Sequence, residues 1–249
     1  MNTTLPALFV SHGSPMILVE PSPARSFLTG LSASLPRPQA ILVVSAHWET
    51  EAPAVSASPR PETIHDFGGF PPELYRFRYP APGAAELAGW VSALTGADTA
   101  MRGLDHGAWV PLLLGWPDAS IPVTQLSVQP HQSSEHHYRL GQALAPLREK
   151  GVLILASGAL THNLRAYFRG GNGEVARSQA FAAWMAAAVT EGRVEDLLAY
   201  REKAPEAAHA HPTEEHLLPL FVALGAATKG EVLHRSLDGS LAMDSYAWQ

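Results

Sequence analysis

The sequence predicts an α/β sandwich in which a sheet is covered on both faces by helices. The first observation is a set of continuously apolar segments, as expected for strands buried on both faces. These segments are 8–10, 41–44 and 152–156. The second is a set of segments with apolar residues at helical spacing, namely 84–94, 135–150 and 178–191. No internal repeat or Pro/Gly/Ser linker interrupts the chain, so we expect residues 1–249 to form a single domain.

The remaining elements follow from the same patterns. Short apolar or alternating runs predict further strands at 54–57, 123–128, 232–234 and 240–243. Helices are expected within 22–35 and 194–200, and a flexible turn at the glycine-rich 170–173. Residues 63–80 combine Gly, Pro and aromatic side chains, which predicts an ordered surface loop that either walls a pocket or packs its rings on the core.

Composition excludes several classes of function. The chain has a net charge of −6, with 17 Lys and Arg residues scattered along it, which argues against binding to nucleic acid or to an anionic membrane surface. It contains no cysteine, so a transition metal would have to be held by His, Asp or Glu. Neither a signal peptide nor a long apolar span is evident, and we expect a soluble cytoplasmic protein.

Histidines follow the predicted strands at the point where each strand ends. His12 and His47 come directly after the first two apolar runs, and His162 follows the third by a few residues. Ligands of open α/β sheets bind beyond the carboxyl ends of the strands. Neutral imidazole is the commonest metal ligand and suits Fe(II) or Zn(II). We therefore expect these histidines to converge on one metal ion.

His216 is a fourth candidate ligand. Thr213 is placed to cap a helix whose first turn includes His216, and the positive end of such a helix would keep the imidazole neutral. Pro219 would lie inside that helix, so the helix either starts later or is kinked. From spacing alone, His216 is equally well explained as a ligand and as an exposed residue of a first turn.

The other titratable residues carry weaker signals. His106 lies at a turn beside Asp105, which is placed to orient it or to charge it. Adjacent Glu214 and Glu215 are typical of a favourable contact with a helix N-terminus. Five further histidines lie in polar stretches and are expected to be solvated: His131, His136, His137, His209 and His211.

Several motifs are spread over nearly the whole chain. They are His12-Gly13-Ser14-Pro15, Ser45-Ala46-His47-Trp48, Ile64-His65-Asp66-Phe67-Gly68-Gly69-Phe70-Pro71, Asp105-His106-Gly107-Ala108-Trp109, His162-Asn163-Leu164 and Pro212-Thr213-Glu214-Glu215-His216-Leu217-Leu218-Pro219-Leu220. Together and in this order, they resemble the motifs of the 4,5-DOPA extradiol dioxygenase family. This family belongs to the class III extradiol ring-cleaving dioxygenases, alongside the protocatechuate 4,5-dioxygenase catalytic subunit.

The resemblance implies a three-layer α/β/α sandwich around a mixed, mostly parallel sheet. It also implies that His12, His47 and His216 bind the metal, with Fe(II) as the working ion and Zn(II) as an alternative occupant. His162 is then the acid/base or a further ligand, and His106 contacts the substrate. The implied reaction opens the ring of a small aromatic diol with O₂. The wider class has a carboxylate as third ligand, where this chain has His216.

Contacts with the substrate are expected from the aromatic and basic loop. We predict that His65 and Tyr75 line the ring pocket, together with Phe77 and Tyr79, and that Arg76 or Arg78 meets a substrate carboxylate. Two other functions fit the same residues. One is a zinc-dependent hydrolase whose three histidines activate water, and the other is a non-catalytic binding protein on this scaffold. The sequence leaves the oligomeric state open.

Overall fold

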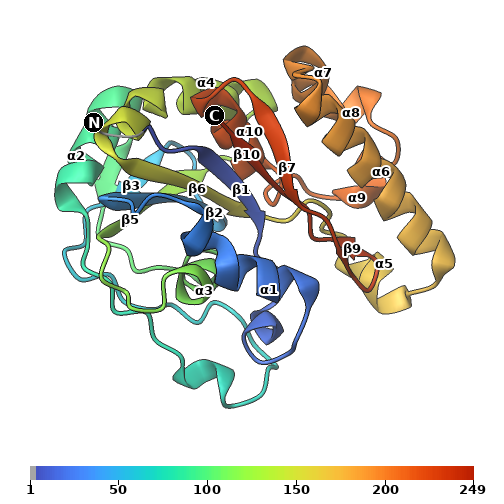
Figure 1. Ribbon diagram of the computed structural model, residues 1–249, viewed down its shortest axis with the longest axis horizontal. Coiled ribbons are helices and arrows are strands. Elements are labelled where there is room, and N and C mark those ends of the chain that lie inside the picture. Colours follow the sequence, from blue (N-terminus) through green and yellow to red (C-terminus); the bar gives the residue numbers. More distant parts are fainter. Residues whose placement is uncertain (1–3) are drawn as a thin grey trace.

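The structure is a computed structural model that describes residues 4–249, and its centre is an eight-stranded sheet (Figure 1). The strand order is β4-β3-β5-β2-β6-β1-β10-β7. The strands are β1 (Ala7–Ser11), β2 (Ala40–Glu49), β3 (Ala54–Ser56), β4 (Asp98–Ala100), β5 (Val123–Val128), β6 (Val152–Gly158), β7 (Gly230–His234) and β10 (Ser245–Trp248). A separate hairpin pairs β8 (Leu237–Asp238) with β9 (Leu241–Ala242).

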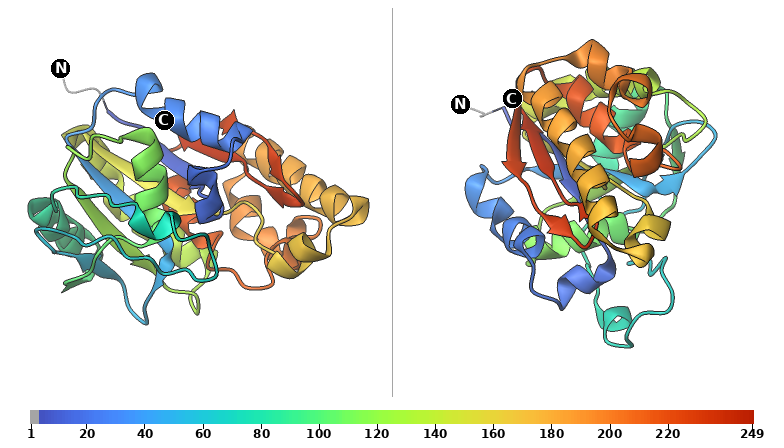
Figure 2. Two further views of the ribbon diagram at one scale, coloured as in Figure 1. Left: turned by 90° about the horizontal axis from the view of Figure 1, so that it is seen from below. Right: turned by 90° about the vertical axis from the view of Figure 1, so that its right-hand side faces the viewer.

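Helices cover both faces of the sheet (Figure 1). The α-helices are α1 (Pro23–Gly30), α2 (Ala85–Thr95), α3 (His106–Gly115), α4 (Ser134–Leu144), α5 (Leu164–Arg169), α6 (Asn172–Thr190), α7 (Val194–Leu198), α8 (Tyr200–Lys203), α9 (Ala207–Ala210) and α10 (Leu218–Ala226). Short 3₁₀ helices are η1 (Pro15–Leu18), η2 (Leu31–Ser34), η3 (Leu74–Arg76) and η4 (Ala145–Lys150). Helices α6 to α9 lie beside the β7 edge (Figure 2).

The sheet is mixed and mostly parallel, as the sequence predicted. Strand β6 lies between β1 and β2 and pairs in parallel with both, and β2 pairs in parallel with β5. The C-terminal strand β10 runs antiparallel to β1 and to β7. The parallel strands therefore end at one edge of the sheet, and the histidines that follow them start from neighbouring positions.

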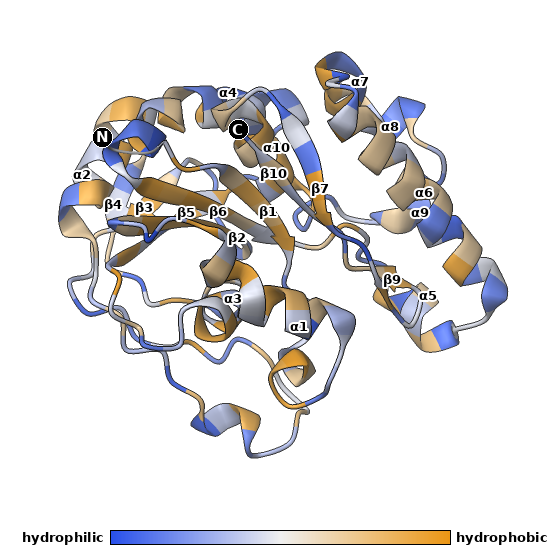
Figure 3. Ribbon diagram, viewed as in Figure 1, coloured by the Kyte–Doolittle hydropathy of each residue, from blue (hydrophilic) through white to orange (hydrophobic). Residues whose placement is uncertain are grey.

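Alternate residues of the central strands pack into two hydrophobic cores, one on each face. On β2, Leu42 and Val44 pack with α2, α4, α6 and α10, whereas Ile41 and Val43 pack with α1 and α3. Most residues along these strands are hydrophobic (Figure 3). Burial on both faces explains why the strands read as continuous apolar runs rather than as alternating ones.

Most predicted elements are present, with shifted boundaries. The helix expected at 178–191 begins earlier, at Asn172, so the flexible turn expected at 170–173 is confined to Gly170 and Gly171, with φ angles of 65° and 100°. The helix expected to begin near Thr213 begins at Leu218 instead. Pro219 then lies in the first turn, where its missing N–H would have no helical partner in any case. No helix within residues 4–249 is long and apolar enough to cross a membrane.

Two histidines that were expected to be solvated are fully buried. His137 donates from Nδ1 to the Ser133 carbonyl (2.9 Å) and accepts the Gln129 N–H at Nε2 (3.1 Å). His211 donates from Nε2 to the Leu160 carbonyl (2.7 Å). The prediction of solvation was wrong because polar neighbours along the chain do not report what packs against a side chain from elsewhere in the fold.

We expect these buried histidines to make folding stability depend on pH. Burial lowers the pKa of both His137 and His211 to about 4, whereas unfolded histidines titrate near about 6.5. The unfolded state therefore binds more protons below about pH 6.5, and stability is lost as the pH falls from there towards the folded pKa. Each histidine should cost about 1 kcal/mol at about pH 5.5, as measured by urea unfolding.

The histidine variants separate this effect from general acid destabilisation. His137→Gln should remove one titrating group and flatten the pH dependence by about 1 kcal/mol. His131→Gln serves as the matched control, because the His131 side chain is exposed. Equal pH dependence in the His137→Gln variant and in the unaltered protein would contradict the assignment.

Candidate metal centre

Three histidines reach the carboxyl edge of the sheet from three separate elements. His12 directly follows β1, and its N–H continues the strand pairing by donating to the Gly158 carbonyl (2.9 Å). His47 lies near the end of β2, beyond the last regular pair with β5. His216 lies in the turn before α10, so it is neither the exposed residue nor the first-turn residue of a helix that spacing suggested.

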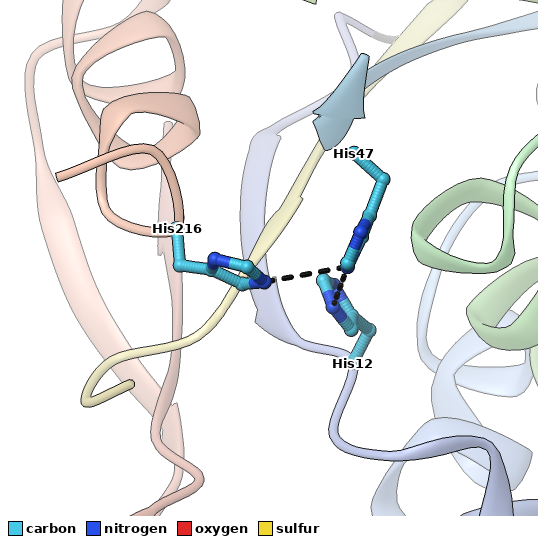
Figure 4. A group of neighbouring side chains, drawn as sticks. All are labelled: His12, His47 and His216. Atoms are coloured by element: carbon cyan, nitrogen blue, oxygen red, sulfur yellow. Dashed lines mark hydrogen bonds between the residues drawn. The ribbon is translucent and has the colours of Figure 1, made fainter. Parts of the chain in front are cut away.

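The imidazoles of these residues converge on one point (Figure 4). His47 Nε2 lies 3.1 Å from His12 Nε2 and 3.3 Å from His216 Nε2. One nitrogen atom from each ring lies within 4.8 Å of the other two, which makes the group able to hold a metal ion. His12 is 2% exposed and His216 5%, so both rings are held by the surrounding packing.

The outer nitrogen atoms fix the protonation of the rings. The Ser157 hydroxyl donates to the Gly107 carbonyl, so it accepts the proton of His12 Nδ1 (3.0 Å). The Glu215 carboxylate accepts the proton of His216 Nδ1 (2.8 Å), and Asp66 Oδ2 lies 3.5 Å from His47 Nδ1. With protons on the Nδ1 atoms, three Nε2 lone pairs face one another. That arrangement is repulsive by itself and is stabilised by a cation.

Electrostatics keeps the three rings neutral and ready to bind metal. Burial lowers the pKa of His12 and of His216 well below the usual value, and the neighbouring histidines add to the effect. Burial and His106 together lower the pKa of His47 to about 3, against the opposing charge of Asp66. A metal ion therefore competes with few protons at neutral pH. Nitrogen donors of this kind suit both Fe(II) and Zn(II).

The other two predicted histidines flank the cluster. The His162 ring stacks on the His216 ring with centroids 3.4 Å apart, and the His106 ring lies 3.9 Å from that of His47. Burial lowers the pKa of His162, with Glu215 opposing the shift from 3.8 Å away. The structure thus brings together all five histidines that the sequence singled out for the metal and for catalysis.

Two carboxylates that the sequence did not assign to the metal centre, Asp66 and Glu215, each lie beside one histidine of the cluster and one flanking histidine. Asp66 Oδ2 is 3.0 Å from His106 Nδ1 and also faces His47. Glu215 Oε1 lies 2.8 Å from His216 Nδ1 and 3.8 Å from His162 Nδ1. The sequence predicted that Asp105 orients or charges the His106 ring. In the structure, the Asp105 carboxylate has other partners. It caps α3 and accepts the Ser45 hydroxyl (2.6 Å).

A cavity of about 440 Å³ opens above the five histidines. Its walls are largely aromatic and apolar, with Phe67 and Phe70 on one side and Leu164, Tyr167 and Phe168 on the other. The second wall was not predicted, because a six-residue helix such as α5 is too short to show which of its residues face inward. A flat aromatic ligand fits a cavity of this shape and chemistry.

The residues predicted to contact substrate lie behind this wall. The Phe67 ring separates His65 and Tyr75 from the cavity, with centroids at 5.6 Å and 5.1 Å from its own. Arg76 is exposed at the end of η3 and does not line the cavity. The loop therefore does form a wall, but through Phe67 and Phe70, while its other rings pack outside them.

Comparison with known proteins agrees with this geometry. Residues 6–245 match the family described as the catalytic LigB subunit of aromatic ring-opening dioxygenase. The chain belongs to this family. A LigB-family relative, 4,5-DOPA dioxygenase extradiol of Beta vulgaris, is 46% identical over 246 residues, which cover 94% of this chain and 92% of the relative. The protein of the same name from Escherichia coli (strain K12) is 41% identical over 234 residues, covering 90% and 86%.

The fold is shared with a solved structure. The crystal structure of an uncharacterized protein from Escherichia coli K12 superposes with a TM-score of 0.81 at 34% identity, over 98% of this chain and 100% of that one. Membership of the LigB family and the relatives' names support extradiol ring cleavage by this enzyme. The zinc hydrolase and the non-catalytic binding protein are not favoured.

We expect the Glu215 carboxylate to strengthen metal binding through His216. Glu215→Gln keeps the size of the side chain but removes the charge that holds the His216 proton on Nδ1. Affinity for Zn(II) or Co(II), measured by competition with a chelator, should fall about 10- to 100-fold. Glu214→Gln is the matched control, because the Glu214 carboxylate bonds to Tyr200 rather than to a histidine. Equal affinities in the two variants would contradict this role.

Proposed function

We propose that this LigB-family chain is an Fe(II)-dependent extradiol dioxygenase for a catechol, and that residues 1–249 form one catalytic domain. The observation that carries the proposal is the convergence of three Nε2 lone pairs at the floor of an aromatic cavity. His12, His47 and His216 would hold the ion. The relatives named 4,5-DOPA dioxygenase extradiol make a DOPA-like catechol the substrate class to test first.

The two flanking histidines supply the proton chemistry. Fe(II) held by the three histidines would lower the pKa of both catechol hydroxyls and supply the redox chemistry for O₂. Glu215 lies near His162 Nδ1, which leaves His162 Nε2 as the atom that takes a proton from the diol. The same atom returns that proton as the ring opens, so one residue acts as base and then as acid. Asp66 Oδ2 lies 3.0 Å from His106 Nδ1, which leaves His106 Nε2 to contact a substrate oxygen.

The cavity walls orient the ring and exclude water. Phe67 and Phe70 come from the loop before η3, and Phe168 comes from α5 on the opposite side. A catechol between these walls presents its two oxygen atoms to the histidines and its edge to the opening. Overall, one carbon–carbon bond beside the diol breaks and both oxygen atoms of O₂ enter the product, which is a yellow semialdehyde.

Loading with metal tests the proposed reaction directly. We expect the metal-free protein, loaded anaerobically with Fe(II) and mixed with a catechol, to consume one O₂ for each ring opened, measured with an oxygen electrode and by absorbance. Protein loaded with Zn(II) is the control and should consume none, because zinc has no accessible redox change. Absence of O₂ uptake by the iron-loaded protein with every catechol tried would overturn the proposal.

A substitution of His162 tests the proton transfer separately from metal binding. His162→Gln should lower kcat by about 10²- to 10⁴-fold, the usual contribution of general acid–base catalysis. Fe(II) content should stay unchanged, because His162 is not one of the three converging ligands. The acidic limb of the pH–rate profile should also disappear. A variant that loses its iron along with its activity would instead identify His162 as a further ligand.

A further inference from the structure

A second hollow continues the cavity away from the histidines. It has a volume of about 290 Å³ and shares part of its wall with the first, namely Ser14, Met16, Tyr167 and Asp238. Its remaining wall comes from the segment around η1 and from the β8–β9 hairpin. A catechol with its diol at the histidines would direct a substituent of the ring into this second hollow.

The charge in this second hollow is negative. Asp238 lines both hollows and Glu20 lines the second, whereas no Lys or Arg of residues 4–249 lines either one. Within that part of the chain, neither carboxylate makes an ion pair or accepts a hydrogen bond from a side chain. The Asp238 and Glu20 carboxylates are therefore free to meet a cation carried by the ligand.

Tyr167 adds an aromatic face between these carboxylates. Its ring packs so closely on the hairpin turn that a Cβ at Gly239 would lie 2.7 Å from its Cε2 atom. The pKa of the Tyr167 hydroxyl is raised, chiefly by the charge of Asp238 and to a smaller extent by burial and the charge of Glu20. Asp238, Glu20 and Tyr167 therefore lie close to one another. Carboxylates beside an aromatic face form the usual environment for an ammonium group.

The basic loop offers no competing site for an anionic substituent. Arg78 Nη1 donates to the Tyr75 and Phe77 carbonyls, both at 2.7 Å, and Arg76 lies away from both hollows. A substrate carboxylate would therefore meet like charge rather than a guanidinium. The sequence predicted a positively charged side chain, Arg76 or Arg78, at the end of the substrate. The second hollow instead presents negatively charged side chains.

We propose that Asp238, supported by Glu20 and Tyr167, determines specificity for catechols whose side chain ends in an ammonium group. The proposal rests on the ring-opening function and adds the chemical class of the substituent. A catecholamine is preferred over a catechol with a neutral side chain, and a catechol with a carboxylate side chain is disfavoured. A zwitterionic amino acid side chain falls between the amine and the acid.

Binding to the zinc-loaded protein tests this preference without turnover. Dopamine, propylcatechol and dihydrocaffeate carry the same diol ring and differ chiefly in the charge at the end of the side chain. We expect dopamine to bind at least about fivefold more tightly than propylcatechol, and dihydrocaffeate to bind most weakly, by titration calorimetry. Raising the salt concentration should reduce the differences, because the carboxylates are exposed.

Matched variants assign the preference to particular carboxylates. Asp238→Asn should lower the ratio of dopamine to propylcatechol affinity by about fivefold, and Glu20→Gln by a smaller factor. Asp98→Asn is the control, because Asp98 is an exposed carboxylate on the edge strand β4 and lines neither hollow. Propylcatechol itself should bind equally to all of these proteins.

The outcomes separate this inference from the ring-opening function. Equal affinity for the three catechols, or a ratio that Asp238→Asn leaves unchanged, overturns the inference while O₂ uptake by the iron-loaded enzyme still supports the function. Absence of O₂ uptake overturns the function, and the zinc-loaded protein still decides the charge preference. Failure of every catechol to bind the zinc-loaded protein overturns both.

Discussion

The mutual approach of three imidazole Nε2 atoms is the constraint on which the rest of the structure depends. Lone pairs from His12, His47 and His216 would repel one another at these distances, so the fold has to hold each ring from behind. It does so with a hydroxyl and two carboxylates at the outer nitrogen atoms. Burial adds to this by keeping the rings unprotonated. A divalent cation bound between the three Nε2 atoms would therefore relieve the repulsion and stabilise this arrangement.

The parallel sheet makes this close approach possible, because it fixes the backbone positions from which two of the rings start. Strands β1 and β2 both pair with β6, so two of the rings begin from neighbouring strand ends that are already fixed by backbone hydrogen bonds. Helices on both faces bury these strands, and the histidine cluster lies at their carboxyl edge. The chemistry is concentrated at that edge because the carboxyl ends of the parallel strands meet there, and ligands of open α/β sheets bind beyond those ends.

The sequence predicted the features that depend on periodicity and missed those that depend on tertiary contact. Continuous apolar runs located the strands, and the strand ends located His12, His47 and His162. The partners Asp66 and Glu215 were not assigned, because nothing in a linear pattern says which ring a carboxylate will face. His137 and His211 were misjudged for the same reason. The wall formed by Tyr167 and Asp238 lies on elements too short for any period to appear.

The approach of β6 to the turn that carries His216 has a further consequence. A Cβ at Gly158 would lie 2.0 Å from the His216 carbonyl oxygen, and that carbonyl accepts the Ala159 N–H at 2.9 Å. The absence of a side chain at this one position lets two distant parts of the chain touch through their backbones. An added carbon at position 158 would therefore push away the turn that carries His216, and with it one of the three imidazoles that converge on the centre.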